Sequence, residues 1–350
     1  MNLMWNAPFF KLRRWVLFIL LPSIGLYACD APAKSQKPTG VSESLIISEN
    51  AETVTCRLPD GGVSVVPKKP RRTVILLTSL LEPWVASGGT AIARCAGHMN
   101  VPPETSSLPV VGTFSNPNVE KIIALTPDLV LASNVGHFRA MIPILEQNKI
   151  PYAYFDYINY YDYVRLAALF AKINGTEERF KKVHDRLIAE VAAVTTKCRK
   201  FNSPKVLILF ATSHSVLCEL PNSQTGVMLE MLGGRNIITE QRCTGNETRV
   251  DFSLEQIVQL NPDIILLNTM GDAVEGQAHL KKIYETNAAW AALRAVQDNR
   301  FYVLPKQYFL YKPNRAFPNA LRYLAQVLYP DFDPAFRNRN AGSGQQGTHE

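Results

Sequence analysis

Aromatic and cationic side chains near the carboxyl ends of apolar segments are the residues of this chain best suited to bind a ligand. In an open α/β sheet, ligands bind in the loops that follow the strands. Rings supply apolar contact area, and Arg or Lys supplies charged hydrogen bonds, which suits a large flat ligand that carries negative charge. The candidates are Trp84, Phe114, Asn134, Tyr157, Tyr160, His214, Met270, Tyr308, Tyr311, Lys312 and Arg315. Any one ring could equally pack beneath its loop, and Arg315 could pair with a carboxylate.

A motif that occurs twice predicts the elements that position these loops. Residues 118–131 and 253–266 share the order of a capping residue, an acidic first turn, a short amphipathic helix, a Pro-Asp break and a buried strand. Two copies predict two similarly built lobes, and two lobes predict a cleft. The repeat places Glu120 and Glu255 at the same point of each lobe.

Strand–helix alternation predicts the α/β class, with mainly parallel sheets. The first lobe is expected over residues 54–157, starting with a hairpin at 54–66. Residues 158–200 are expected to be helical and to end in one long helix, capped by Thr176, that acts as a strut between the lobes. The second lobe is expected over residues 201–335.

The two ends of the chain do not read as part of this fold. Residues 1–28 combine a basic start, a short apolar run and a small residue before Cys29, which is typical of an export signal. The Leu-x-Ala-Cys ending resembles a bacterial lipobox and predicts lipidation of Cys29; the alternative is a plain signal peptide. Residues 29–53 read as a flexible tether and 336–350 as a disordered tail. Asp30 resembles a signal for inner-membrane retention.

Charge and cysteine content narrow the class further. The formal charge of +7 falls to a mild value without the leader, and basic residues do not cluster with aromatics, so no nucleic-acid partner is expected. An exported protein can keep disulfides. The preferred pair is Cys218–Cys243, and Cys56–Cys95 is an alternative in the first lobe. We expect no metal ligands, because no cysteine–histidine spacing suggests a zinc site.

Several segments together resemble the class III periplasmic substrate-binding proteins of ABC importers, which serve ferric siderophores, haem and cobalamin. The resemblance runs from about residue 54 to 330. It rests on the two repeat copies and on Gly233-Gly234-x-Asn236-Ile237, Trp290-x-x-Leu293-x-Ala295-Val296 and Arg300-x-Tyr302-x-Leu304-Pro305. It implies two Rossmann-like lobes, one rigid connecting helix and a ligand cleft between the lobes.

The resemblance also implies the partners. In this family one surface glutamate of each lobe docks onto the permease, which assigns that role to Glu120 and Glu255. Each glutamate also complements the dipole of its helix, worth about 0.3–1 kcal/mol. The implied partners are an ABC permease dimer with its ATPase and a small metal chelate. The protein is expected to be a monomer on the periplasmic face of the cell membrane, anchored through Cys29.

The leading interpretation is therefore a binding lipoprotein rather than an enzyme. The sequence lacks a Gly-rich phosphate loop, a nucleophile elbow and an H-E-x-x-H motif. No cofactor is expected, and the modest positive charge favours a ferric siderophore over haem or cobalamin as cargo. His214 could ligate haem iron, although a lone histidine is more often structural. The alternatives are a metal chelatase on a related scaffold and a lipoprotein that has lost its ligand.

Overall fold

The structure is a computed structural model that describes residues 44–97, 99, 101–239, 247–270 and 287–333. Cys29, Asp30, Cys243 and the tail at 336–350 lie outside these ranges, as does most of the predicted tether. Within them, no helix combines the length and the apolar character needed to cross a membrane.

Three short strands open the described chain as an antiparallel sheet. In pairing order they are β1 (Ile46–Glu49), β2 (Thr53–Arg57) and β3 (Val63–Pro67). The β2–β3 pair confirms the predicted hairpin, and Gly61 in its turn has φ 84°, a left-handed conformation that favours glycine. The predicted end of the tether at residue 53 is wrong, because residues 46–49 pair along the edge of β2.

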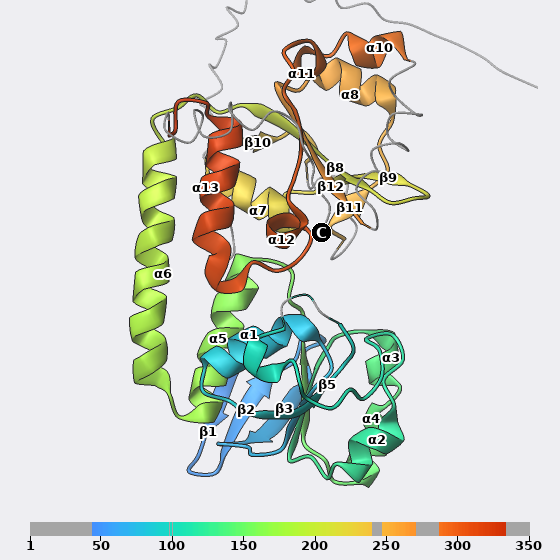
Figure 1. Ribbon diagram of the computed structural model, residues 1–350, viewed down its shortest axis with the longest axis vertical. Coiled ribbons are helices and arrows are strands. Elements are labelled where there is room, and N and C mark those ends of the chain that lie inside the picture. Colours follow the sequence, from blue (N-terminus) through green and yellow to red (C-terminus); the bar gives the residue numbers. More distant parts are fainter. Residues whose placement is uncertain (1–43, 98, 100, 240–246, 271–286, 334–350) are drawn as a thin grey trace, which may run out of the picture. The chain divides into compact units, whose positions relative to one another are not determined.

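The first lobe is built on a four-stranded sheet in which every pair is parallel, as predicted. Its order is β5 (Ala91–Arg94), β4 (Thr73–Ile75), β6 (Leu129–Ser133) and β7 (Tyr152–Phe155). Nearly all of β4 and β6 is buried, as expected of parallel strands covered by helices. The helices of this lobe are α1 (Thr78–Ala86), the 3-10 turn η1 (Pro103–Thr105), α2 (Val119–Ala124), α3 (Gly136–Arg139) and α4 (Ile142–Gln147) (Figure 1).

Two helices lead from the first lobe to the second. α5 (Tyr160–Asn174) ends at Gly175, whose φ of 67° gives the left-handed cap that glycine favours. α6 (Glu177–Cys198) has 22 residues, or roughly 33 Å, and packs beside α13 (Phe317–Leu328) (Figure 1). The predicted capping role of Thr176 is wrong: its hydroxyl donates to the Ser87 carbonyl at 2.7 Å and makes no cap hydrogen bond.

The second lobe has a mixed sheet around one long buried strand. Its main path is β11 (Arg249–Val250), β9 (Val216–Glu219), β8 (Lys205–Ala211), β12 (Ile264–Thr269) and β13 (Phe301–Val303), with β10 (Arg235–Asn236) also on β8. β8, β10, β12 and β13 pair in parallel, whereas β9 and β11 are antiparallel. The helices of this lobe, besides α13, are α7 (Gln224–Met231), α8 (Leu254–Leu260), α10 (Ala288–Ala291), α11 (Arg294–Gln297), α12 (Lys306–Phe309) and the 3-10 turn η3 (Asn314–Ala316).

The repeated motif begins in the same way in both lobes. The side chain of Asn118 caps α2 by accepting the backbone N–H of Lys121 at 2.8 Å. Ser253 caps α8 by accepting the N–H of Gln256 at 3.3 Å. Both predicted caps are therefore confirmed, and each satisfies an N–H that the helix leaves unpaired.

The Pro-Asp break of each copy ties the motif to the neighbouring strand. Asp128 accepts the backbone N–H of Arg72 at 2.8 Å, next to the start of β4. Asp263 accepts the N–H of Lys205 at 2.8 Å, at the start of β8. β4 pairs with β6 and β8 pairs with β12, so each aspartate fixes the amino ends of two adjacent parallel strands.

The structure excludes one of the two predicted disulfide bridges. Cys56 and Cys95 are both free and buried, which excludes the alternative bridge in the first lobe. Cys218 is also buried, and Cys243, its predicted partner, lies outside the described residues. Burial raises the pKa of Cys56 and Cys218 to about 12, so these thiols are unreactive near neutral pH.

Candidate functional site

Two grooves open where segments of the first lobe meet segments of the second. The first, which we name the apolar groove, has a volume of about 380 Å³. It is lined by Leu77, Thr78, Ser79, Gly97, Met99, Leu310, Tyr311 and Lys312. Residues 77–79 follow β4, Gly97 follows β5 and residues 310–312 come after β13, so the groove lies beyond the carboxyl ends of strands from both lobes. The expected position of the ligand cleft agrees with this arrangement.

Gly97 allows the close approach of two loops in the apolar groove. Its φ is 145°, and a Cβ at this position would lie 2.9 Å from Cγ2 of Thr78. A larger side chain would therefore push the β5 loop away from the start of α1. The groove also keeps the hydroxyl groups of Thr78 and Ser79 beside the apolar surface of Leu77 and Met99.

The second groove, which we name the charged groove, has a volume of about 290 Å³. It is lined by Glu82, residues 101–104 and residues 312–316. Arg315 donates from Nε to Oε1 of Glu82, and the two side chains form an ion pair across the groove. The Glu82 side chain is 15% exposed and that of Arg315 is 60% exposed, so the arginine has a free surface that the glutamate lacks. Burial raises the pKa of Glu82, and the Arg315 charge opposes that shift.

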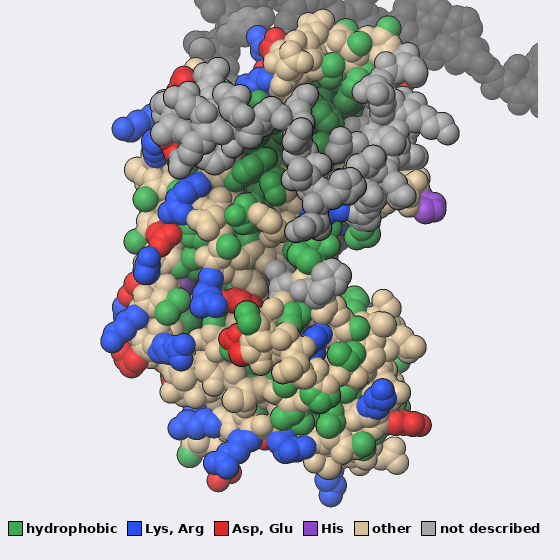
Figure 2. Space-filling model, viewed as in Figure 1, with side chains coloured by type: hydrophobic (Ala, Val, Ile, Leu, Met, Phe, Trp, Pro, Cys, Tyr) green, Lys and Arg blue, Asp and Glu red, His purple; other side chains and the backbone are tan. Residues whose placement is uncertain are grey.

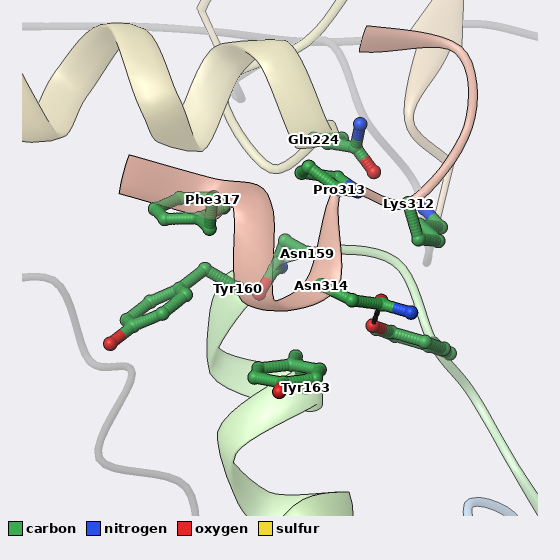
Figure 3. A pocket seen from close by; sticks show the side chains of 9 residues that line it. Asn159, Tyr160, Tyr163, Gln224, Lys312, Pro313, Asn314 and Phe317 are labelled. Carbon is green, nitrogen blue, oxygen red and sulfur yellow. Dashed lines mark hydrogen bonds between the residues drawn. The ribbon is translucent and has the colours of Figure 1, made fainter. Parts of the chain in front are cut away.

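A narrow pocket lies behind the grooves, with room for about one water molecule. Figure 3 shows residues 312–314 facing Asn159, Tyr160 and Tyr163 at the start of α5. The Tyr157 hydroxyl donates to Oδ1 of Asn314. The ring of Tyr160 stacks on Phe317 with centroids 4.3 Å apart.

Lys312 borders both grooves and the narrow pocket. Its Nζ donates to the carbonyl oxygen of Ile158 at 2.5 Å. Burial lowers the pKa of Lys312 to about 8; the charges of Asp162 and Glu219 oppose the shift, and Arg249 adds to it. The lowered pKa means that the Lys312 ammonium group, at the centre of the site, gives up its proton more easily than an ordinary lysine does.

Five of the predicted candidates lie at this site. Tyr311, Lys312 and Arg315 line the grooves, and Tyr157 and Tyr160 line the narrow pocket. Tyr157 and Tyr160 are both buried, and burial raises their pKa values. These two tyrosines contact Asn314 and Phe317 of the second lobe, whereas the other three residues line the grooves.

The prediction that Trp84 lies in the cleft is wrong. Trp84 is fully buried, its Nε1 donates to the Thr90 carbonyl at 3.0 Å, and its ring packs edge-on against Phe170. The reason is that Trp84 belongs to α1, which runs from Thr78 to Ala86. Trp84 therefore lies well inside the helix, on its buried face, rather than in the loop after β4.

The other predicted candidates lie outside the lining of the two grooves. His214 is exposed in the turn between β8 and β9, and Met270 is 51% exposed after β12. Tyr308 packs against the rings of Phe309 and Tyr323. Phe114 packs edge-on against His137, and Asn134 accepts two hydrogen bonds from Arg139, at 3.0 and 2.7 Å.

Sequence reasoning missed several residues that line the grooves. Glu82 and Ser79 lie in α1, and neither carries the ring or positive charge that most of the candidates share. Met99 has no flanking strand signal at all. Gln224 holds the groove wall from behind, because its Nε2 donates to the carbonyl oxygens of Tyr308 and Tyr311 at 2.9 Å each.

Glu120 and Glu255 occupy equivalent positions on the surface of the two lobes. Each is exposed and is the second residue of its helix, Glu120 in α2 and Glu255 in α8. The structure therefore places the two carboxylates as the repeat predicts.

Among the described residues, no group of three or more His, Cys, Asp or Glu side chains is arranged to hold a metal ion. In Figure 2 the molecular surface is indented between the two lobes, at the right-hand edge of the view.

Comparison with known proteins places the chain among transport proteins. A model of the family described as periplasmic binding protein matches residues 73–308. Over 308 residues the chain is 26% identical to the putative ABC transporter substrate-binding lipoprotein YhfQ of Bacillus subtilis, covering 82% of this chain and 88% of that protein.

Two solved structures from Staphylococcus aureus share the fold. IsdE complexed with haem has a TM-score of 0.64 and 23% identity, covering 74% of this chain and 98% of that one. SirA complexed with staphyloferrin B has a TM-score of 0.63 and 20% identity, covering 80% of this chain and 98% of that one.

Proposed function

The chain belongs to the periplasmic binding protein family, as the substrate-binding component of an ABC importer, and from this premise we propose that its cargo is an iron chelate. A ferric siderophore is our first choice, and haem or a corrinoid is the second. The observation that carries the proposal is the pair of adjoining grooves, built from loops of both lobes and joined at Lys312. One groove offers apolar surface and the other offers charge, which matches a chelate with an organic body and polar edges.

The relatives support an iron-related cargo. IsdE is described as a haem uptake protein, and SirA was solved with staphyloferrin B. The positive side chains at the groove, Lys312 and Arg315, favour a chelate with anionic groups. We propose the siderophore first because the grooves hold no described histidine, and His214 is exposed in the β8–β9 turn.

The family also supports the partners and the location. Its members are transport components, so we propose a permease with an ATPase as the partner, contacted through Glu120 and Glu255. We propose export of the chain and its attachment to the membrane through lipid on Cys29, with Asp30 as a retention signal. No observation favours the chelatase alternative, which needed a histidine facing a carboxylate across the cleft.

Calorimetric titration tests the cargo directly. The purified protein is titrated with ferric desferrioxamine B, ferric citrate, haem and cyanocobalamin, with metal-free desferrioxamine B as the control. We expect one-to-one binding of an iron chelate, with a dissociation constant of about 1 μM or lower, equivalent to roughly −8 kcal/mol. Failure of all four ligands to bind would contradict the proposal.

A further inference from the structure

One short segment of the second lobe makes three polar contacts with the first lobe. We name residues 312–315, between α12 and α13, the linking segment. Lys312 donates to the Ile158 carbonyl, Asn314 accepts from the Tyr157 hydroxyl, and Arg315 pairs with Glu82. Glu82 belongs to α1, and residues 157 and 158 lie between β7 and α5. Four consecutive positions therefore supply three polar contacts between the lobes.

The linking segment has a left-handed backbone conformation at Asn314. Asn314 is 5% exposed and has φ 50°, in the region that asparagine tolerates better than most residues other than glycine. Three constraints hold this buried position in place. The Tyr157 hydrogen bond and the flanking Lys312 and Arg315 contacts are those constraints.

The contact with Glu82 is the one that a ligand can reach. Glu82 and Arg315 both line the charged groove, and more than half of the Arg315 side chain is exposed there. Glu82 is largely buried, with 15% of its side chain exposed. A carboxylate or similar anion in the groove would compete with Glu82 for the same guanidinium group, since guanidinium binds carboxylates strongly.

We propose that the linking segment is a latch between the lobes, and that an anionic group of the cargo releases it by taking Arg315 from Glu82. The proposal rests on the proposed function for the presence of a cargo, but the latch itself exists without one. Cargo binding would in this way change how firmly the two lobes are joined. Each lobe carries one of the two glutamates proposed to contact the permease, Glu120 and Glu255.

A matched pair of Glu→Gln substitutions tests the latch in the absence of cargo. Glu82→Gln removes the charge that holds Arg315. Glu190→Gln is the control, because Glu190 pairs with Arg322 between α6 and α13 at 3.2 Å but does not line a groove. We expect amide hydrogen exchange over residues 157–163 and 312–317 to be roughly ten-fold faster in Glu82→Gln than in the wild type. We expect no such change in Glu190→Gln. Equal exchange in all three proteins would overturn the latch.

A second comparison tests release by an anion. Glu82→Gln removes the carboxylate that competes with the cargo for Arg315, and Arg315→Gln removes the group that would bind the cargo. The two substitutions should therefore have opposite effects on the affinity for an anionic cargo. Ferric citrate and haem, which carry carboxylates, should bind Glu82→Gln several-fold more tightly than the wild type and Arg315→Gln roughly ten-fold more weakly. Cyanocobalamin, which has no carboxylate, is the comparison ligand.

Each outcome decides a separate statement. If the wild type binds none of these ligands, nor ferric desferrioxamine B, the proposed function fails while the exchange experiment still decides the latch. If only cyanocobalamin or ferric desferrioxamine B binds, release by an anion is wrong. If Glu82→Gln binds the carboxylate chelates no more tightly than the wild type, competition for Arg315 is wrong. Thermal melting of each variant confirms that it is folded.

Discussion

At the scale of single residues, Lys312 has a clear electrostatic consequence, because it is a lysine whose pKa burial lowers from 10.5 to about 8. Between these two values the unfolded chain binds a proton at this side chain that the folded protein does not. Stability must therefore rise with pH over this interval. The full effect is roughly 3 kcal/mol at 1.36 kcal/mol for each pH unit.

The first prediction concerns this pH dependence. Lys312→Met should remove this pH dependence. Between pH 8 and 10.5 the free energy of unfolding should therefore rise by roughly 3 kcal/mol more in the wild type than in the variant. Urea denaturation of both proteins at several pH values measures the difference. Lys121→Met is the control, because Lys121 is exposed on α2 and should leave the pH dependence of the wild type intact. Parallel curves for the wild type and Lys312→Met would show that this side chain is not desolvated.

The second prediction concerns Cys29, which the proposed lipid anchor requires. Cys29→Ser in the full chain should abolish incorporation of labelled palmitate and shift the protein from the membrane fraction to the fraction released by osmotic shock. Cys198→Ser is a suitable control, because Cys198 is a free buried thiol at the end of α6. Membrane attachment that survives Cys29→Ser would contradict the anchor.

Residues were harder to predict from the sequence than elements, for a geometric reason. Arg315 and Lys312 line the grooves, since loops after strands meet at one edge of a sheet. Trp84 was chosen wrongly because it belongs to α1, and the packing of that helix on the core decides that its ring faces inward. Met99 lines the apolar groove although nothing in the sequence around it marks it as a candidate.

At the scale of elements, the repeat was readable because its structure is local. Capping side chains, an amphipathic helix and a Pro-Asp break act within a few residues, so both copies fold as the pattern indicates. β1 was missed because its four residues become a strand only by pairing with β2. Thr176 was wrongly predicted to cap α6 with its side chain, because its hydroxyl donates to the carbonyl oxygen of Ser87, just after α1, instead of bonding to its own helix.

The third prediction tests the cap of the first repeat. Asn118→Ala should lower the free energy of unfolding by about 1 kcal/mol, because the N–H of Lys121 loses its acceptor. Asn118→Ser keeps an acceptor and should restore most of that loss. Chemical denaturation of the three proteins checks the order. An Ala variant as stable as the wild type would mean that water replaces the cap without cost.

At the scale of the whole molecule, the two lobes present one glutamate each on equivalent helices. The fourth prediction is that Glu120→Ala with Glu255→Ala leaves the affinity for cargo unchanged and abolishes uptake by the importer. Neither side chain lines a groove, so binding and delivery should separate.

A control with the same local chemistry makes this result specific. Glu178→Ala also removes an exposed glutamate from the first turn of a helix, here α6, and therefore has a similar effect on a helix dipole. Uptake should be normal in that variant. Normal uptake in the Glu120/Glu255 double variant would remove the docking assignment.

The central claim is that cargo binds where the loops of the two lobes meet, and the dissociation constant of a groove variant tests it most directly. Tyr311 lines the apolar groove, whereas Tyr161 is 39% exposed on α5 and lines neither groove. For the chelate that the wild type binds, calorimetry should show at least roughly ten-fold weaker binding to Tyr311→Ala and unchanged binding to Tyr161→Ala. Equal dissociation constants for the wild type and Tyr311→Ala would contradict the placement of the cargo in this groove.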